Sequence, residues 1–398
     1  MESIYLQRYA WPQSLFPDFD PPKNLGLIIV IPAFKEPEIQ LALQSLDQCI
    51  PPEQEVLVIV VINEAKSATK EVSEINQVCL NRIRGFQSNL QILTSYLKLP
   101  QKKAGVGLAR KIGMDEAVRI FRKIDRDGVI ICYDADTRCE KNYLIEIEKT
   151  YADHKVNAGV VFYEHQLNRE NHDAILNYEL YLRYYIDAIR FTGFPHAYQT
   201  LGSCITVRCS HYEKVGGMNT RKAGEDFYFL NKTIPLGGFK EINTTTLRPS
   251  DRVSDRVPFG TGKAVQEILN DTDVYQVYHP NTFEDLKLFF SRIDWLAESN
   301  EWMVPKSVVD FLGSDWREEI TALKSQVSGR ENFERRFYHW FDAFKIMKFV
   351  HFCRDYYYQN VELKEALEWL RQQTHHLHGS LASQLIQLRY HDRNYQSA

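Results

Sequence analysis

The sequence predicts an α/β fold: a mostly parallel, Rossmann-like sheet with flanking helices and a helical C-terminal extension. Three observations support this. Short runs rich in Val and Ile recur through the first third of the chain, a longer polar stretch follows each run, and strand patterns fade beyond about residue 286. Strands that are covered on both faces read as short continuous apolar runs, and polar stretches of this length suit crossover helices.

The strand-like runs of the first third occupy residues 25–34, 55–62, 91–97 and 128–133. In parallel α/β sheets, ligands bind beyond the carboxyl ends of the strands. Pro32, Asn63 and the pair Asp134 and Asp136 all stand at such ends. We therefore expect these residues to line one crevice.

The alternation of strand and helix weakens after residue 157. The spacing predicts a long helix over 171–190, a short strand over 203–210 and a loop entering a helix over 221–238. Residues 244–266 show little periodicity and many Arg, Ser and Gly, which indicates a mobile loop.

The C-terminal part carries an aromatic stripe over residues 331–353. The stripe residues, which share one helical face, are Phe333, Phe337, Trp340, Phe341, Phe344 and Met347. Such a face is more typical of packing against a domain core than of lipid binding.

Composition excludes several classes of protein. The formal charge of −4 offers nothing for nucleic acid, and no apolar run reaches the roughly 18 residues of a transmembrane segment. The beginning, "MESIYLQRYAWPQ", does not resemble a signal peptide. Seven scattered cysteines without CxxC spacing indicate reduced thiols. These features predict a cytoplasmic protein.

Asp134 and Asp136 are the first candidate site residues. Two carboxylates at a strand end repel each other unless a cation neutralises them, and Mg²⁺ or Mn²⁺ accepts oxygen ligands from carboxylates together with a diphosphate. The alternative is a polar turn with an Asp that caps the next helix, because such short motifs are common by chance.

Several motifs along residues 25–240 resemble those of family 2 glycosyltransferases, in the order of that family. The blocks that carry the resemblance are "IIVIPAFKEPEIQLALQSL", "QKKAGVGLARKIGMDEA", "CYDADT" and "LGSCITVRCSHYEKVGGMNTRKAGEDFYFLNK". The matching positions are Pro32, Ala33, Glu36, Lys103, Gly105, Gly107, Ala109, Arg110, Asp134, Asp136, Glu225 and Asp226. Each block alone is a weak signal, and their order makes the resemblance strong.

The resemblance implies a glycosyltransferase-A fold, a nucleotide-diphosphate sugar donor such as a UDP- or GDP-sugar, and Mn²⁺ or Mg²⁺. The acceptor would be a hydroxyl of a saccharide or glycolipid precursor. Asp136 would hold the metal with the diphosphate, and Asp134 would contact the ribose or the metal. Lys103 and Arg110 would lie along the nucleotide cleft.

One departure from the family concerns the end of the second strand. The family usually has Asp-Asp-Gly-Ser there, whereas this chain has "VINEAKS", with Asn63 and Glu64 at the corresponding positions. An amide can still pair with a base edge through one donor and one acceptor. The identity of the base is therefore left open.

Glu225 and Asp226 form the acceptor-side motif. Inverting transfer needs a base that takes the proton of the attacking hydroxyl. The resemblance implies Asp226 as this base, with Glu225 as a supporting contact. Capping of a helix N-terminus is the alternative, and a retaining mechanism stays open.

Two further features could complete the site. Residues 248–263 hold Arg248, Arg252, Arg256 and Lys263 around two glycines, which suits a lid over a diphosphate or, alternatively, a solvated loop. His279 could add a nitrogen ligand to the metal, as a histidine does in several glycosyltransferase-A enzymes, or could be structural.

Two other functions compete with sugar transfer. A sugar-phosphate nucleotidyltransferase would need a glycine-rich loop after the first strand, and "PAFKEPE" has no glycine. A non-catalytic nucleotide-sugar-binding module would have lost its acidic motifs, which are present here. We expect a catalytic domain over 1–285, with a nucleotide-binding half at about 25–140 and an acceptor-side half at 141–285, and a helical region over 286–398 packed on it.

Overall fold

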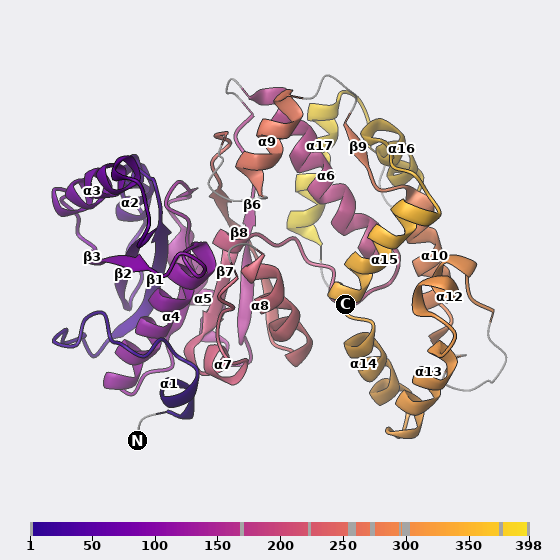
Figure 1. The fold of residues 1–398 in the computed structure, drawn as a ribbon, viewed down its shortest axis with the longest axis horizontal. Coiled ribbons are helices and arrows are strands. Elements are labelled where there is room, and N and C mark those ends of the chain that lie inside the picture. The colour runs from indigo at the N-terminus through magenta and orange to yellow at the C-terminus, as the bar shows by residue number, and fades with distance from the viewer. Residues whose placement is uncertain are drawn as a thin grey trace. The chain divides into compact units, whose positions relative to one another are not determined.

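The computed structural model describes residues 3–167, 171–221, 224–253, 260–270, 275–293, 296, 303–373 and 377–395. The chain divides into two compact units (Figure 1), Met1–Asn171 with Thr200–Glu267, and His172–Gln199 with Ile268–Ala398. These boundaries differ from those of the two expected domains, because residues 172–199 group with the C-terminal helices. Where the functional domain ends stays a prediction.

The first unit is built on an eight-stranded sheet. Its strands are β1 Leu25–Ala33, β2 Glu55–Ala65, β3 Gln91–Leu99, β4 Val129–Cys132, β5 Arg138–Cys139, β6 Ala158–Tyr163, β7 Ile205–Arg208 and β8 Phe239–Arg248. They lie in the order β3-β2-β1-β4-β7-β6-β8-β5. The pairs β1–β2, β1–β4, β2–β3 and β6–β8 are parallel, and the other three pairs of this sheet are antiparallel. The sheet is thus mostly parallel, as the sequence predicts.

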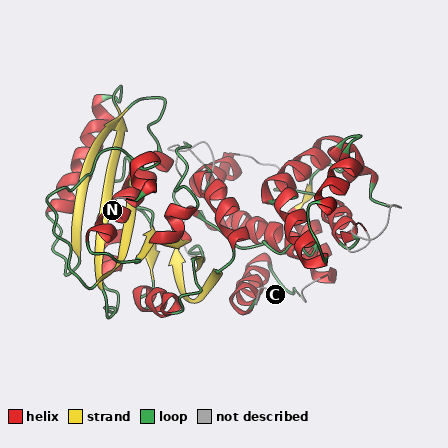
Figure 2. Ribbon diagram, turned by 90° about the horizontal axis from the view of Figure 1, so that it is seen from below, coloured by secondary structure: helices red, strands yellow, loops and turns green. Residues whose placement is uncertain are grey.

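Helices flank the strands on both sides (Figure 2). The helical segments of this unit are α1 Ile4–Arg8, α2 Ile39–Asp47, α3 Lys70–Arg84, α4 Val106–Lys123, α5 Tyr143–Ala152, η1 Gly202–Cys204, α7 Cys209–Lys214, α8 Glu225–Thr233 and η2 Ile234–Leu236. The boundary between the two units, after Glu267, lies within α9 Thr261–Asn270. All nine residues of β1 are buried, as expected for a central strand covered on both faces. The predicted α/β fold class is confirmed.

The prediction of a mobile loop over 244–266 is wrong at both ends of that range. Strand β8 extends to Arg248, and helix α9 begins at Thr261. The sequence does not show an apolar run at β8, because Thr245 and Thr246 are polar residues. Both are fully buried, and their β-branched side chains suit a strand.

The second unit is mainly helical. Its elements are α6 His172–Phe191, β9 Gln276–Val277, α10 Pro280–Phe290, α12 Lys306–Leu312, α13 Trp316–Ser325, α14 Arg330–Trp340, α15 Ala343–Tyr356, β10 Val361–Glu362, α16 Leu363–Gln373 and α17 Leu381–Asn394. The strand pattern does not end at 286, since β10 pairs with β9 in an antiparallel ladder. A helical C-terminal region is confirmed.

The aromatic stripe lies on two helices rather than one. Asp342 separates α14 from α15 and caps α15, its carboxylate accepting a hydrogen bond from the Lys345 backbone N–H at 2.8 Å. Phe333, Phe337 and Phe341 are buried, as expected for a core face. Among the described helices, none is both long and apolar enough to cross a lipid bilayer.

Candidate active site

The turn after β1 directs a carboxylate into the protein. Lys35 adopts a positive φ of 50°, and its backbone N–H donates to Asn76 Oδ1 at 2.9 Å, which holds this uncommon conformation. Glu36, the next residue, is fully buried, and its Oε1 accepts the Glu38 backbone N–H at 3.1 Å. The predicted site residue Glu36 is therefore fixed in orientation by its own loop.

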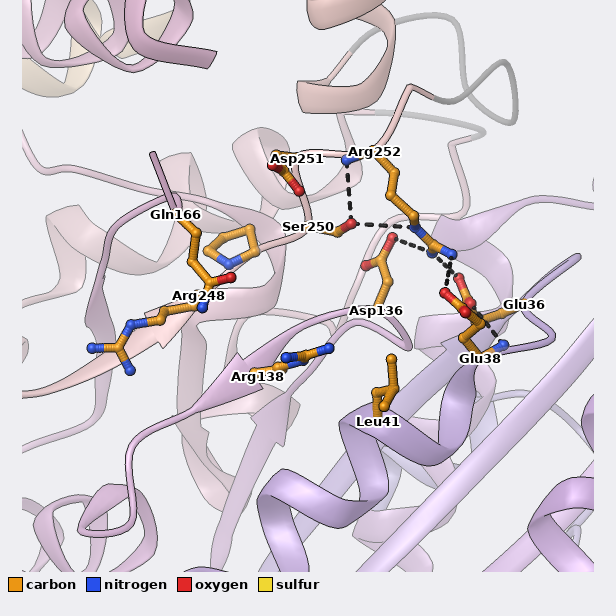
Figure 3. Close-up of a pocket in the computed structure, with 11 residues that line it drawn as sticks. Glu36, Glu38, Leu41, Asp136, Arg138, Gln166, Arg248, Ser250, Asp251 and Arg252 are labelled. Carbon is orange, nitrogen blue, oxygen red and sulfur yellow. Dashed lines mark hydrogen bonds and ion pairs between the residues drawn. The ribbon is translucent and has the colours of Figure 1, made fainter. Parts of the chain in front are cut away.

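Arg252 gathers three carboxylates around its guanidinium. Nη2 contacts Glu36 Oε2 and, at 3.2 Å, Asp136 Oδ2, while Nη1 lies 3.3 Å from Glu38 Oε2 (Figure 3). Ser250 Oγ accepts hydrogen bonds from the backbone N and Nε of Arg252, both at 3.3 Å. Burial would lower the pKa of Arg252, but the Glu36 and Asp136 carboxylates raise it above its usual value. We call Glu36, Glu38, Asp136 and Arg252 the Arg252 cluster.

The Arg252 cluster lines a pocket of the first unit. The other residues that line it are Leu41, Arg138, Gln166, Arg248, Pro249, Ser250 and Asp251. Arg248 is engaged in ion pairs, with its Nη2 at 2.8 Å from Glu140 and 3.1 Å from Glu164. Arg248 is thus the last residue of β8, held by two ion pairs, and not part of a loop.

Arg110 links two acidic motifs that are far apart in sequence. Its Nη2 donates to Asp134 Oδ1 at 2.7 Å, and its Nη1 donates to Glu225 Oε1. Burial would lower the pKa of Arg110, but Glu225 and Asp134 raise it. The pKa of Glu225 is raised above its usual value. The effect of burial outweighs the opposing effect of Arg110, and the negative charge of Asp226 raises the pKa further. We call Arg110, Asp134 and Glu225 the Arg110 cluster.

Asp226 stands in the first turn of α8. Its Oδ1 accepts the Phe227 backbone N–H at 2.8 Å, a contact of the kind that stabilises a helix N-terminus. The described residues make no further hydrogen bond to Asp226, so Oδ2 is available for another group. Capping and proton transfer are therefore compatible at this side chain.

Asn63 and Glu64 end β2 beside the turn after β1. Asn63 Nδ2 donates to the Ala33 carbonyl at 3.2 Å. Glu64 was not predicted as a site residue, yet it is buried and accepts hydrogen bonds from Tyr96 at 2.6 Å and Asn76 at 3.2 Å. Burial would raise the pKa of Glu64, but these hydrogen bonds, with Lys98 and Ser73, lower it. A charged residue within an otherwise apolar strand was the signal in the sequence.

The remaining predicted residues fall in different places. Pro32 and Ala33 are buried at the carboxyl end of β1, and Lys103 is exposed in the loop after β3. Arg256 lies outside the described residues. His279 belongs to the second unit, where its Nδ1 accepts the Asn281 backbone N–H at 3.0 Å as the N-cap of α10. Its role as a metal ligand stays a prediction.

The second unit contains another group with possible metal ligands. Ligand atoms of Asp187, His391 and Asp392 all lie within 4.8 Å of one another. Arg190 already contacts both aspartates, and Arg183 contacts Asp392. Because arginines neutralise these carboxylates, the group does not require a metal ion.

The structure therefore brings five of the predicted residues of the first unit, Glu36, Arg110, Asp134, Asp136 and Glu225, into two arginine clusters. Glu36 and Asp136 meet at Arg252, whereas Asp134 and Glu225 meet at Arg110. Glu38 and Arg138 were missed, because a single charged residue near a motif carries no signal of its own. Their contribution follows only from their position in the pocket.

No protein-family model matches this chain, and a search of curated proteins finds no match. Solved structures show a distant likeness. Residues 1–349 of TarS from S. aureus are 14% identical over 83% of this chain and 87% of TarS 1–349, with a TM-score of 0.40. The same segment in complex with UDP-GlcNAc is 14% identical over 80% of this chain and 91% of that one, with a TM-score of 0.41.

The mannosyltransferase PcManGT from Pyrobaculum calidifontis, in complex with GDP-Man and Mn²⁺, is also similar. It is 13% identical over 93% of this chain and 89% of its own, with a TM-score of 0.39. Similarity at this level does not transfer a function.

Proposed function

We propose that this chain is a metal-dependent glycosyltransferase that moves a sugar from a nucleotide-diphosphate donor to an acceptor hydroxyl with inversion. The observation that carries the proposal is the Arg252 cluster. Residues from the loops after β1, β4 and β8, which are far apart in sequence, place three carboxylates around one cationic group. In α/β sheets of this kind, the carboxyl ends of the strands are where ligands bind.

The donor set of this cluster fits Mn²⁺ or Mg²⁺. Both ions prefer oxygen ligands and are commonly held by one or two carboxylates together with substrate phosphates. Asp136 of this cluster would hold the ion together with Asp134 of the Arg110 cluster, two residues earlier in the chain. When bound, such a metal neutralises the charge of the leaving diphosphate.

The protein's own residues have separate tasks in this proposal. Asp226 accepts the proton of the acceptor hydroxyl at Oδ2 while the hydroxyl oxygen bonds to the anomeric carbon. The bond from that carbon to the donor phosphate breaks, and the nucleoside diphosphate leaves with the electron pair. Glu225 supports the acceptor side of the site.

The nucleotide would lie along the ends of β1 and β2. Pro32, Ala33, Glu36 and Asn63 would border it, and Lys103 would contribute a positive charge from the loop after β3. Arg256 would contact the diphosphate. Arg110 is buried and holds Asp134 and Glu225, which supports a role in positioning these carboxylates rather than in contacting the nucleotide.

Binding of metal and nucleotide is the first test. UDP, GDP, CDP and dTDP are screened by thermal shift with and without Mn²⁺, because a ligand of the native state raises the unfolding midpoint. Calorimetry then compares the preferred nucleotide with Asp136→Asn, which we expect to lose about 10-fold or more of the Mn²⁺-dependent affinity. Asp310→Asn, an exposed aspartate of the second unit, is the control. Equal Mn²⁺-dependent binding by wild type and Asp136→Asn would contradict the proposal.

Turnover is the second test. Asp226→Asn keeps the size of the side chain but cannot take a proton, so we expect turnover to fall by about 10²–10⁴-fold with donor affinity nearly unchanged. Nucleotide binding without any transfer or donor hydrolysis in the wild type would instead identify a non-catalytic binding module.

A further inference from the structure

The side chain of Arg110 is almost completely buried beside the crevice residue Asp134. The Arg110 side chain is 3% exposed, as is that of Glu225, whereas the side chain of Asp134 is 38% exposed. Of its two carboxylate partners only Asp134 is substantially exposed, so Asp134 is the partner through which Arg110 can act on a bound nucleotide or metal. This argues against a direct contact between Arg110 and the nucleotide.

Two glycines allow the Arg110 cluster to form. A Cβ on Gly107 would lie 2.1 Å from the Arg221 carbonyl oxygen and 3.0 Å from Glu225 Cβ, so α4 can approach the start of α8 only without a side chain there. A Cβ on Gly202 would lie 3.0 Å from both Arg110 Nη1 and Asp226 Oδ2. The backbone is thus shaped around the contact between Arg110 and the Glu225–Asp226 motif.

The guanidinium is suited to hold two carboxylates at once. It is planar and presents its two Nη groups in different directions, so each can donate to a separate partner. Within the described residues, Arg110 Nε has no hydrogen-bond partner, so the two carboxylates alone set the orientation of the group. A lysine at this position would keep the charge but not the two-directional contact.

We infer that Arg110 is a positioning residue that couples the donor side of the site to the acceptor side, by holding Asp134 and Glu225 at a fixed separation. The inference rests on the proposed function, in which Asp134 faces metal and nucleotide and Glu225 faces the acceptor. A substitution at Glu225 then changes the position of Asp134 and so the affinity for metal and nucleotide, although the two carboxylates do not contact the same ligand. Coupling of this kind is reciprocal and can be measured as a linkage.

A double-mutant cycle tests this coupling. Mn²⁺-dependent affinity for the nucleotide preferred in the thermal-shift screen is measured by calorimetry in the wild type, Glu225→Gln, Arg110→Lys and the double variant. We expect Glu225→Gln to weaken the Mn²⁺-dependent affinity by about fivefold or more, within the usual range of coupling between sites. In the Arg110→Lys background the same change should have less than about a twofold effect.

The matched control is Arg119→Lys, the same substitution on the same helix. Arg119 pairs with Glu116 at 3.4 Å and takes no part in the Arg110 cluster. In this background Glu225→Gln should keep its full effect. A general disturbance of α4 would instead reduce the effect in both arginine variants, which would overturn the inference.

Far-UV circular dichroism shows whether Arg110→Lys folds. If it does not, a second variant provides the test. Gly202→Ala adds one methyl group beside Arg110 Nη1 and Asp226 Oδ2 without a change of charge, and we expect it too to suppress the effect of Glu225→Gln. Gly85→Ala, whose added Cβ would lie 3.5 Å from the Asn81 carbonyl oxygen, is its control.

The outcomes separate the inference from the proposed function. If the wild type binds none of the four screened nucleotides with Mn²⁺, the proposed function fails and the inference fails with it. If the wild type binds one of them but Glu225→Gln acts equally in every background, the function stands and the coupling is refuted. Loss of the Glu225→Gln effect only in Arg110→Lys and Gly202→Ala supports the coupling.

Discussion

Two arginine and carboxylate clusters of this protein use the same chemistry in different surroundings. In the Arg252 cluster, the side chains of Arg252, Asp136 and Glu38 are 34%, 23% and 56% exposed. In the second unit, Arg183 pairs with Glu179 and Asp392, and these three side chains are at most 3% exposed. We call the latter group, with Arg190 and Arg389, the Arg183 cluster.

The difference in exposure separates a binding site from a structural network. A buried ion pair has given up its hydration, so removal of one partner leaves a charge that neither water nor ligand can reach. In the Arg252 cluster, water reaches Arg252, Asp136 and Glu38, and only Glu36 is fully buried, so another cation can replace the guanidinium at smaller cost than in a fully buried network. The same residue types therefore stabilise the fold in one place and remain exchangeable in the other.

Removal of Arg183 should give the largest effect. Arg183→Met leaves Glu179 and Asp392 buried without their shared partner, although Arg389 and Arg190 still contact them. We expect a loss of about 3–5 kcal/mol in the free energy of unfolding. Urea unfolding followed by far-UV circular dichroism measures it. A loss below about 1 kcal/mol, the range of an exposed pair, would remove the distinction between the two clusters.

A pH series sharpens the comparison within the first unit, where two buried carboxylates have opposite pKa shifts. The pKa of Glu64 is lowered, because its hydrogen bonds outweigh burial, whereas burial raises the pKa of Glu225. Ionised Glu64 thus stabilises the fold above its unfolded pKa, and this contribution is lost as the pH falls through the folded pKa. For Glu225 the native state binds the proton more tightly, so stability rises as the pH falls toward the unfolded value.

Two variants measure these opposite slopes. The stability of the wild type relative to Glu64→Gln should decrease from pH 6 to pH 3.5, and its stability relative to Glu225→Gln should increase from pH 7 to pH 5. One proton can contribute at most about 1.4 kcal/mol per pH unit. Urea midpoints in both windows provide the measurement, and slopes of the same sign for the two pairs would contradict the assignment.

Removal of Arg252 should lower stability less than removal of Arg183. Arg252→Met breaks ion pairs with the partly exposed Asp136 and Glu38 and one with the buried Glu36, so we expect a loss of about 1–3 kcal/mol, of which the part from the exposed pairs shrinks at high salt. Thermal melts at low and high NaCl concentration, with Arg183→Met in parallel, measure this. A loss as large as that of Arg183→Met would show that the Arg252 cluster is structural.

The sequence by itself determined the first four strands of the sheet and the location of the acidic motifs. Buried parallel strands are recognisable as short apolar runs, and all four predicted strands of the first third are present as β1 to β4. Their carboxyl ends carry Pro32, Asn63 and Asp134, as expected. These features depend on local composition, which a linear pattern records.

Only the tertiary structure decided which charged residues meet. The pairing of Arg252 with Glu36 joins residues 216 positions apart, and that of Arg110 with Glu225 joins residues 115 apart. Such contacts depend on strand order, on the approach of α4 to α8 and on the missing side chains of Gly107 and Gly202. The break between α14 and α15 likewise depends on the cap made by Asp342, which an aromatic pattern conceals. Apolar periodicity reports what one element buries, whereas the partner of a charged side chain is set by the packing of distant elements.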